Sequence, residues 1–557
     1  MVSQPATREV TNQSPPFEGI NLFTTDRALR EAVVREGGER AIESLTGFGA
    51  RCGSVEAAQH SRLANAFPPQ LRAFDRQGRR LDMVEFHPSY HALMTMSCAE
   101  GLHAKVHDHL AQAGASPAPG INVTRAAGFY MAAQMEAGHC CPITMTNACV
   151  PALLQQPDLA EEWLPRILSR TYDPAFKPSI EKTGATIGMG MTERQGGTDV
   201  RTNTTRAVPV QGGGPGREYV LTGHKWFMSA PMSDAFLVLA QAPKGLSCFL
   251  MPRFLPDGTV NALHFQRLKD KLGNRSNASS EVDFETASAW LIGEEGRGVP
   301  VIIEMVSATR LDCAISSAGL MRRAVAEAIH HARYRTVFGK KLIDQPLMTQ
   351  VLADLALDVE AATALVFRLA RACDRQEDER ARAWLRLMTP VTKYWVCKLA
   401  PALTYEAMEC LGGNGYVEDG MLARIYREVP VNAIWEGSGN VMALDVLRVL
   451  QREPDVAEIA LEDIGASVGE DRVLAAAFAR VQSILHEPRA LDLRARSLVE
   501  GLARLAAGAI LRAHAPAAVA DAYVATRLAG DFRQTWGQGL EKADTRVILD
   551  RALPGEA

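Results

Sequence analysis

No run of eighteen consecutive apolar residues occurs in this sequence, so we expect no transmembrane helix. The N-terminal stretch MVSQPATREVTNQSPPFEG is polar and lacks the apolar centre of a signal peptide. The 10 cysteines are scattered and include no C-x-x-C pair, which excludes the usual zinc-site spacing and gives no sign of a disulfide framework. We therefore expect a reduced, cytoplasmic protein that binds no metal and touches no membrane.

Several catalytic signatures are missing as well. The sequence has no H-E-x-x-H and no G-x-S-x-G, which leaves zinc protease and serine hydrolase chemistry without support. GATIGMGMTE lacks the third glycine of a dinucleotide fingerprint, and FGKKL lacks the Ser or Thr that follows the lysine of a phosphate loop. A formal net charge of −4 gives no whole-protein attraction towards nucleic acid or an anionic membrane.

The chain of 557 residues is too long for one hydrophobic core, and its periodicity divides it into four regions. Residues 1–183 place apolar side chains at three- and four-residue intervals, as a helical domain does. Residues 184–295 contain short β-type runs, such as LSCFLMPRFL, separated by Gly, Pro and Asp. Helical spacing returns in long segments over 296–445, typical of an antiparallel bundle, and continues in 446–557. The sequence therefore predicts a mainly α protein with a central β domain.

One carboxylate, Glu436, lies between apolar bulk and small residues in the stretch IWEGSGN. Glycines on either side of a serine are poor helix formers and allow close approach of a partner. The segment VMALDVLRVL that follows has helical spacing. Two interpretations are open from these residues alone: a loop glutamate before a helix start, or an acid at the edge of a binding site.

Five stretches then occur in a fixed order along the chain. They are IGMGMTERQGGTDV (187–200), GHKWFMSA (223–230), RTVFGKKLIDQP (335–346), CLGGNGY (410–416) and IWEGSGN (434–440). In order and wording they resemble the acyl-CoA dehydrogenase family of flavoproteins. NLFTTDRALREAVVREG, GHCCPITMTNACVPALL and RLKDKLGNRSNASSEVDF are similar to its AidB-type branch, which extends the resemblance to nearly the whole chain.

The resemblance implies the acyl-CoA dehydrogenase fold. This fold has an N-terminal helical domain, a middle domain that is a β-barrel or sandwich, and a C-terminal four-helix bundle, here with a further helical domain at 446–557. FAD is the implied cofactor, bound between the middle domain and the bundle.

The first two stretches would contact the flavin ring. The residues implied are Met189, Gly190, Met191, Thr192, Gly197, Thr198, Phe227, Met228 and Ser229. Arg194 and Thr198 stand where the family usually has proline and serine. Phe227 aligns with the flavin-stacking aromatic, but Trp226 stays an alternative, because alternation along a strand makes the register decisive.

The third and fourth stretches would reach the FAD of a neighbouring subunit. Arg335 would pair with its pyrophosphate, and Phe338 and Gln345 would flank its adenosine. Gly412 and Gly413 would approach the same cofactor. The resemblance therefore predicts a homotetramer, and at least a dimer. Glu409 stands where the family often has glutamine.

Glu436 aligns with the catalytic base of most family members. It would remove the α-proton of a short, branched, isovaleryl-CoA-like thioester while the β-hydride passes to the flavin. The Glu436 N–H and a ribityl hydroxyl of the flavin would donate to the thioester oxygen. The other implied cofactor contacts are Ile434, Trp435, Gly437, Ser438 and Asn440. Some relatives place the base on another helix, near Arg310 and Asp312 here, and neither residue clearly substitutes.

The AidB-type branch is associated with the response to DNA alkylation, so double-stranded DNA is the alternative partner. From Asp445 to the end there are 14 Lys and Arg against 17 Asp and Glu, so this region is not basic overall. Five arginines nevertheless cluster along one helical segment: Arg489, Arg494, Arg496, Arg504 and Arg512. A DNA-binding flavoprotein with little turnover stays open beside the dehydrogenase, as does a relic that holds FAD without turnover.

Overall fold

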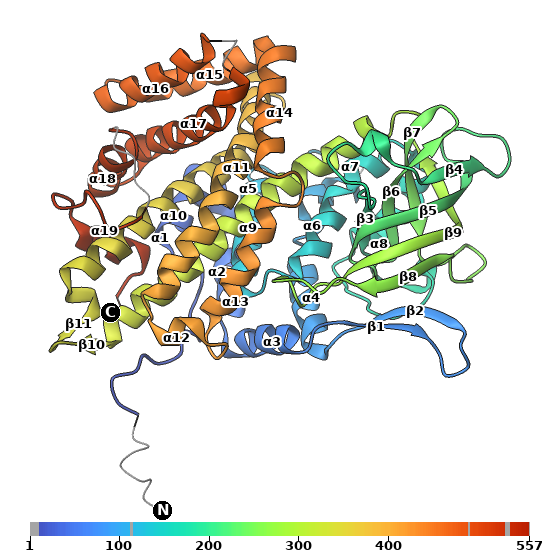
Figure 1. The fold of residues 1–557 in the computed structure, drawn as a ribbon, viewed down its shortest axis with the longest axis horizontal. Helices are drawn as coiled ribbons and strands as arrows, with labels where there is room; N and C mark the ends of the chain where they lie inside the picture. Colours follow the sequence, from blue (N-terminus) through green and yellow to red (C-terminus); the bar gives the residue numbers. More distant parts are fainter. Residues whose placement is uncertain (1–9, 112–114, 488–490, 530–534, 556–557) are drawn as a thin grey trace, which may run out of the picture. The chain divides into compact units, whose positions relative to one another are not determined.

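The structure is a computed structural model that describes residues 10–111, 115–487, 491–529 and 535–555 (Figure 1). Its chain divides into two compact units. The barrel unit is the continuous stretch Val55–Asp312, and the bundle unit combines the residues up to Ser54 with those from Cys313 onward. The long helix α9 (Gly298–Tyr334) begins in the barrel unit and ends in the bundle unit.

Helices and a hairpin precede the barrel within the barrel unit. The helices are α3 (Val55–Ala66), α4 (Pro88–Glu100), α5 (Ile121–Met135), α6 (Cys140–Ala148), α7 (Val150–Leu153) and α8 (Pro157–Ile167). The hairpin consists of β1 (Gln70–Phe74) and β2 (Arg80–Glu85), paired antiparallel. It departs from the mostly helical pattern expected for residues 1–183. Leu71 and Val84 from its two strands pack against the barrel core, which explains why this segment is extended.

Seven strands form the barrel. They are β3 (Ile187–Gly190), β4 (Arg206–Pro209), β5 (Glu218–Ser229), β6 (Ala235–Ala242), β7 (Gly245–Pro252), β8 (Leu263–Leu268) and β9 (Ser279–Ile292). The pairing closes on itself, because β5 pairs with β9, β9 with β7, β7 with β6, β6 with β4, and β4 with β5. β3 also lies between β5 and β6, antiparallel to β5 and parallel to β6. Closure pairs strand edges that an open sheet would expose.

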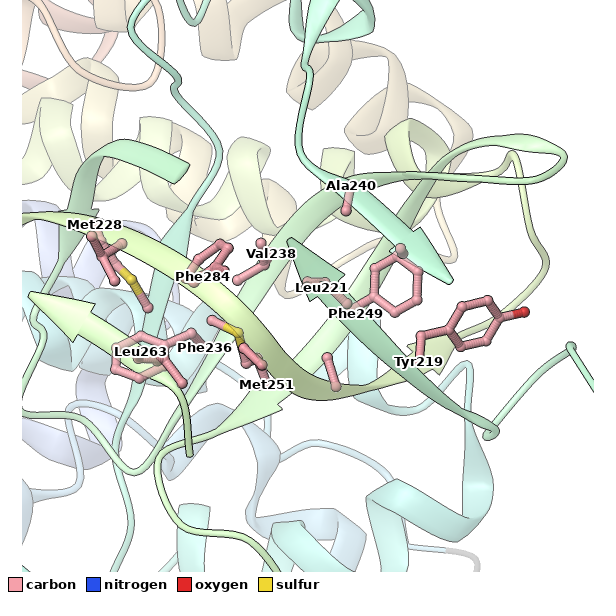
Figure 2. Packing of buried hydrophobic residues seen from close by; sticks show 14 of the residues in the cluster. Tyr219, Leu221, Met228, Phe236, Val238, Ala240, Phe249, Met251, Leu263 and Phe284 are labelled. Carbon is pink, nitrogen blue, oxygen red and sulfur yellow. The ribbon is translucent and has the colours of Figure 1, made fainter. Parts of the chain in front are cut away.

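The barrel interior is filled by apolar side chains at alternate strand positions (Figure 2). Tyr219 and Leu221 of β5 are buried there, as are Val238 and Ala240 of β6. Each pair is two residues apart, which is the period that places side chains on one face of a strand. With the interior occupied by core side chains, the outer faces and the loops carry what the barrel unit contributes to a site.

The bundle unit consists mainly of helices, of which α10 and α11 are long (Figure 1). Before the extension they are α1 (Arg27–Arg35), α2 (Ile42–Cys52), α10 (Pro346–Cys373), α11 (Glu379–Glu409), α12 (Gly413–Tyr416), α13 (Met421–Glu428) and α14 (Gly439–Arg452). Strands β10 (Thr336–Val337) and β11 (Lys340–Lys341) form a short hairpin between α9 and α10. α10 packs against α11, and both helices are buried over most of their length.

A helical extension completes the bundle unit. Its helices are α15 (Pro454–Val468), α16 (Arg472–Leu485), α17 (Leu491–His514), α18 (Ala517–Arg527) and α19 (Thr545–Ala552). Two arginines attach it to the earlier helices. Arg527 of α18 pairs with Asp358 of α10 at 2.9 Å, and Arg551 of α19 pairs with Glu360 of α10 at 2.7 Å. Arg551 also bonds Glu31 of α1, so the last helix touches the first.

The predicted fold class is confirmed, since a helical region, a closed β-barrel, a helical bundle and a helical extension follow one another along the chain. Among the described residues, no helix combines the length and apolarity needed to cross a membrane. Within the same residues, no group of three or more His, Cys, Asp and Glu side chains is arranged to hold a metal ion.

Candidate active site

The loop after β3 is fixed by a buried ion pair. Lys225 Nζ lies 2.8 Å from Glu193 Oε1, and the two residues are only 1% and 0% exposed. The backbone N–H groups of Thr204 and Thr205 donate to the same carboxylate. Burial opposes ionisation of Glu193, but Lys225 and these donors outweigh it and hold the pKa well below its ordinary value. The carboxylate therefore anchors the loop immediately after Thr192.

The predicted cofactor residues of this stretch change from buried to exposed along the chain. Residues 189–190 are buried in β3, residues 191–192 are half-buried, and Gly197 and Thr198 are exposed. A Cβ on Gly197 would lie 2.3 Å from Thr192 Oγ1, so this position has no room for a side chain. Gly197 thus lets the loop fold back onto Thr192 and present its backbone on the surface.

A β-bulge in β5 places two aromatic residues side by side. Lys225 pairs with Val282 of β9 and Met228 with Ser280, so β5 has one extra residue between these pairs. Trp226 and Phe227 occupy the bulge, and Lys269 Nζ lies 3.5 Å from the Trp226 ring centroid and 4.5 Å from that of Phe227.

Phe227 is 47% exposed, so part of its ring is open to a bound cofactor even though Lys269 lies over it. Trp226 is less exposed, and Arg194, Arg267 and Lys269 all lie near its ring. This exposure favours Phe227 over Trp226, and the stacking role of Phe227 stays a prediction. The Met228 side chain points into the barrel core (Figure 2). Ser229 pairs with Met189 of β3, which brings the first two motifs together.

A buried glutamate that the sequence analysis did not single out supports the neighbouring loop. Glu136, at the end of α5, accepts hydrogen bonds from His139 N at 2.8 Å, Ser276 Oγ at 2.7 Å and Asn65 Nδ2 at 3.1 Å. Burial opposes its ionisation, but the hydrogen bonds from His139 and Ser276 outweigh burial and lower the pKa to about 2. His139 also bonds Ser97 Oγ at 2.8 Å. Ser97 and His139 are both 0% exposed, so the Ser97–His139–Glu136 chain links buried elements and cannot present a nucleophilic hydroxyl to a substrate.

In the bundle unit, the Glu436 stretch lies between the 3₁₀ turn Val429–Ala433 and α14. Glu436 has φ 58°, a left-handed backbone that is uncommon for residues other than glycine, and the following Gly437 has φ 107°. The Trp435 indole N–H donates to Asn432 Oδ1 at 3.0 Å. Such a backbone persists only where the surroundings determine it, and it is most common at functional sites.

A second buried lysine holds this stretch from α11. Lys393 is 1% exposed, and its ammonium donates to the Trp435 carbonyl at 2.8 Å and to the Gly437 carbonyl. These two carbonyls flank Glu436 in the chain. Beside them, Ile434 is 66% exposed, and Ser438 and Asn440 are exposed as well.

The hairpin β10–β11 carries the predicted contacts to a neighbouring subunit. Phe338, at its tip, is 96% exposed and has φ 52°. Arg335 donates to the Asn12 carbonyl at 2.7 Å, and the Gln345 amide donates to the Val337 carbonyl at 3.0 Å. In this chain, therefore, Arg335 and Gln345 brace the hairpin from which Phe338 projects.

The predicted glycine pair lies at the start of α12. Gly412 has φ 59°, and neither Gly412 nor Gly413 would bring an added Cβ within 4 Å of another atom. Asn414 donates to Gln13 at 2.9 Å, just as Asn12 contacts the Arg335 stretch. The N-terminal residues Asn12 and Gln13 thus bridge two predicted cofactor stretches. No sequence signal marks these two residues, because they lie in a polar, proline-containing segment without periodicity.

Asp312 is part of a separate ion pair in the barrel unit. Arg125 makes a two-pronged contact with it, with both N–O distances 2.7 Å, and Thr144 donates to the same carboxylate. Arg310 is buried, at 8% exposure. Asp312 is therefore held as an ion-pair partner, which agrees with Glu436 being the candidate base.

Four arginines of the predicted DNA-binding cluster have polar partners, and Arg489 lies outside the described residues. The partners are Glu487 for Arg494, the Tyr394 hydroxyl for Arg496, Glu500 for Arg504, and Asp471 and Asp521 for Arg512. Carboxylates offset most of the positive charge that these arginines would otherwise present to phosphates.

A closed barrel followed by a bundle of long helices, with a carboxylate in a strained turn before α14, is the arrangement of an acyl-CoA dehydrogenase. Comparison with protein-family models agrees along the chain. Residues 12–174 match the adaptive response protein AidB N-terminal domain, 188–287 the acyl-CoA dehydrogenase middle domain, and 296–451 the acyl-CoA dehydrogenase C-terminal domain.

Similar proteins cover nearly the full length. AidB of Escherichia coli (strain K12) is 48% identical over 93% of this chain and 94% of its own length. Acyl-CoA dehydrogenase family member 11 of Caenorhabditis elegans is 30% identical over 94% and 90%. The crystal structure of Caenorhabditis elegans ACDH-11 in complex with C11-CoA has a TM-score of 0.86 and 27% identity, covering 99% and 97%. The chain therefore belongs to the acyl-CoA dehydrogenase family, in its AidB branch, as the motifs predicted.

FAD is the cofactor of this family, which confirms the predicted cofactor. The residues fit it. Phe227, Ile434 and Phe338 stand in predicted FAD stretches and are 47%, 66% and 96% exposed, although apolar side chains of this size are usually covered. Gly412 and Gly413 leave open space beside their backbone, as close approach of a cofactor requires.

Proposed function

We propose that this protein is an FAD-dependent dehydrogenase that forms the α,β double bond of a short branched acyl-CoA. The observation that carries the proposal is Glu436, a carboxylate on a left-handed backbone between two carbonyls that a buried lysine holds. Bound FAD supplies the acceptor for the β-hydride. Glu436 takes the α-proton, so that one C–H bond breaks at each carbon and the enoyl thioester leaves.

The surrounding residues support proton abstraction from a weak carbon acid. Trp435 comes directly before Glu436, and its indole N–H donates to Asn432 Oδ1 at 3.0 Å, which fixes the residue next to the candidate base. The Glu436 N–H is a donor for the thioester oxygen, where negative charge develops as the α-proton leaves. In the barrel unit, Met189, Thr192 and Ser229 would offer backbone and hydroxyl groups to FAD, and Phe227 would offer a ring face.

The proposal includes an assembly and a division of labour. Domains 1–183, 184–295 and 296–445 would form the catalytic body, with 446–557 as an extension. Arg335, Phe338 and Gln345 would reach the FAD of a second subunit in a homotetramer. The 96% exposure of Phe338 supports this, since an aromatic ring at a hairpin tip is expected to be covered by a partner.

The acyl chain is tested by anaerobic titration of the flavin absorbance. Isovaleryl-CoA is the first substrate, because isovaleryl-CoA dehydrogenases are among the relatives. C11-CoA ends the series, because a similar structure holds that ligand. We expect a thioester of this series to bleach the flavin of the wild type, and Glu436→Gln to reduce the bleaching rate at least 10³-fold with FAD still bound. A wild-type spectrum unchanged across the series would contradict the proposal.

The alternative is a flavoprotein that binds double-stranded DNA with little turnover. It rests on the arginines of α17, which the structure pairs with acids such as Glu487 and Glu500. Dehydrogenation is favoured because a left-handed backbone at a non-glycine residue such as Glu436 is common at functional sites, whereas the arginine pairs suit a solvated helix face.

A further inference from the structure

We infer that Lys393 is a positioning residue that sets both the Glu436 carboxylate and the Glu436 N–H for reaction. This inference rests on the proposed function, since it assigns a role within the same site. Its basis is the contact of one buried ammonium with the carbonyls of Trp435 and Gly437, the residues on either side of Glu436.

The two contacts fix the backbone at Glu436. Lys393 comes from the middle of α11, a helix that is buried around this point, so its side chain has little freedom. Its ammonium reaches the Trp435 carbonyl at 2.8 Å and also the Gly437 carbonyl. The peptide before Glu436 and the peptide after Gly437 are both held, so the φ and ψ values of Glu436 and Gly437 between them cannot relax freely to those of an ordinary helix or strand.

The same contacts orient the donor for the thioester oxygen. The Trp435 carbonyl and the Glu436 N–H belong to one planar, trans peptide, in which C=O and N–H point in opposite directions. Because the carbonyl points at Lys393, the N–H of Glu436 points away from α11. A charged donor on the carbonyl also polarises the peptide, and this strengthens its N–H as a hydrogen-bond donor.

Other contacts close the turn without touching both peptides. Asn432 holds the Trp435 indole and donates to Ser317 of α9 at 3.1 Å. A Cβ on Gly437 would lie 2.6 Å from Met442 Cε, so Gly437 is packed against α14. Because these contacts remain in the Lys393→Met variant, we expect it to fold. It loses only the hydrogen bonds that orient Glu436.

The test compares Lys393→Met with a matched control, Lys398→Met. Lys398 lies on the same helix, its side chain is exposed, and its Nζ lies 5.7 Å from the Tyr394 ring centroid. Both variants lose one positive charge from α11. We measure the limiting rate of flavin reduction and the apparent KM with the best thioester, and hydrogen–deuterium exchange of the peptide covering 434–440.

We expect Lys393→Met to keep FAD and a KM within about threefold of wild type. Its reduction rate should fall roughly 10²–10³-fold, as for loss of an oriented oxyanion donor. Amide exchange in 434–440 should accelerate at least tenfold. Lys398→Met should leave both values within about twofold. A Lys393→Met protein with unchanged exchange and a rate within about threefold of wild type would overturn the inference.

The exchange measurement separates this inference from the proposed function. If no thioester reduces the wild-type flavin, the proposed function fails. Faster exchange in Lys393→Met would then still support the inference that Lys393 fixes the Glu436 backbone. Unchanged exchange would overturn that inference. If Lys393→Met does not accumulate as folded protein with FAD, Lys393→Gln takes its place. The amide keeps an N–H donor without the charge, and the same two measurements decide.

Discussion

Replacing Lys225 with methionine removes a charge from the barrel unit with little change in volume. In the wild type its ammonium lies 2.8 Å from Glu193 and 2.8 Å from the Leu239 carbonyl, and both charged residues are shielded from solvent. The variant leaves the Glu193 carboxylate buried with neutral donors such as the Thr204 N–H at 2.7 Å. An ionised carboxylate in such surroundings is strongly disfavoured.

The expected loss is large. Removing one partner of a buried ion pair costs about 3–5 kcal/mol, and the Leu239 carbonyl loses a donor worth about 1 kcal/mol. For a unit of this size, a loss of that order lowers the melting temperature by on the order of 10 °C. Glu193→Gln combined with Lys225→Met removes both charges, so we expect the double variant to recover most of the loss.

Thermal unfolding followed by circular dichroism at pH 7 gives the melting temperature of each variant. The ratio of flavin to protein absorbance after gel filtration shows how much FAD each variant retains. We expect Lys225→Met to lose FAD more readily than wild type, because Glu193 anchors the backbone beside Thr192. A melting temperature within about 2 °C of wild type would refute the reasoning. So would a double variant that melts below the single one.

Two further predictions concern acid stability and DNA. Glu136→Gln should lower the melting temperature at pH 7, and its difference from wild type should shrink as the pH falls from about 5 towards 2. The lowered Glu136 pKa of about 2, against an ordinary 4.5, gives stability that is present above 4.5 and lost on acidification; a pH-independent difference would contradict this. The double variant Arg494→Ala, Arg504→Ala should bind a fluorescent DNA duplex with the same affinity as wild type, measured by fluorescence anisotropy at 50 and 200 mM salt, roughly the range over which phosphate contacts weaken. A tenfold lower affinity would instead support the DNA-binding function.

The sequence predicted the fold well where a segment with regular helical spacing was long. The helical segments over 296–445 have spacing that tertiary contacts reinforce, and α10 and α11 follow it for 28 and 31 residues. The hairpin β1–β2 was missed although a signal existed. The stretch QLRAFDRQGRRLDMVE alternates in polarity around a turn closed by Asp75, which accepts from the backbone N–H groups of Gln77 and Arg79. Neighbouring helical spacing obscured it.

Some residues of the candidate site could be predicted from the sequence, and others could not. Motif resemblance located Glu436 and Phe227, because short stretches near a cofactor keep a recognisable wording. Lys225 and Lys393 were not predicted as supports, since a lysine within a strand or helix usually reaches solvent. Their partners are 32 residues away for Glu193 and 42 for Trp435, and only the tertiary fold brings them together. The β-bulge at Trp226 shifts the register in a way that alternation alone does not reveal.

The contact between the last and the first helix has a consequence for synthesis on the ribosome. The barrel unit is one continuous stretch, so all of its residues have been made once Asp312 is added. The bundle unit is not one continuous stretch, because α1 packs against α10 and α19, which are made much later. At roughly 5–20 residues per second, the segment from Cys313 to the end takes roughly 10–50 s.

During that interval, the apolar face of α1 formed by Leu29, Ala32 and Val33 has not yet met the helices that bury it. Arg551 can bond Glu31 only after α19 has been made. The nascent protein therefore carries an uncovered helix close to its first residues while the barrel unit is already complete. Closure of the bundle around α1 can therefore begin only after α10 has been made, and it is finished only after α19 has been made.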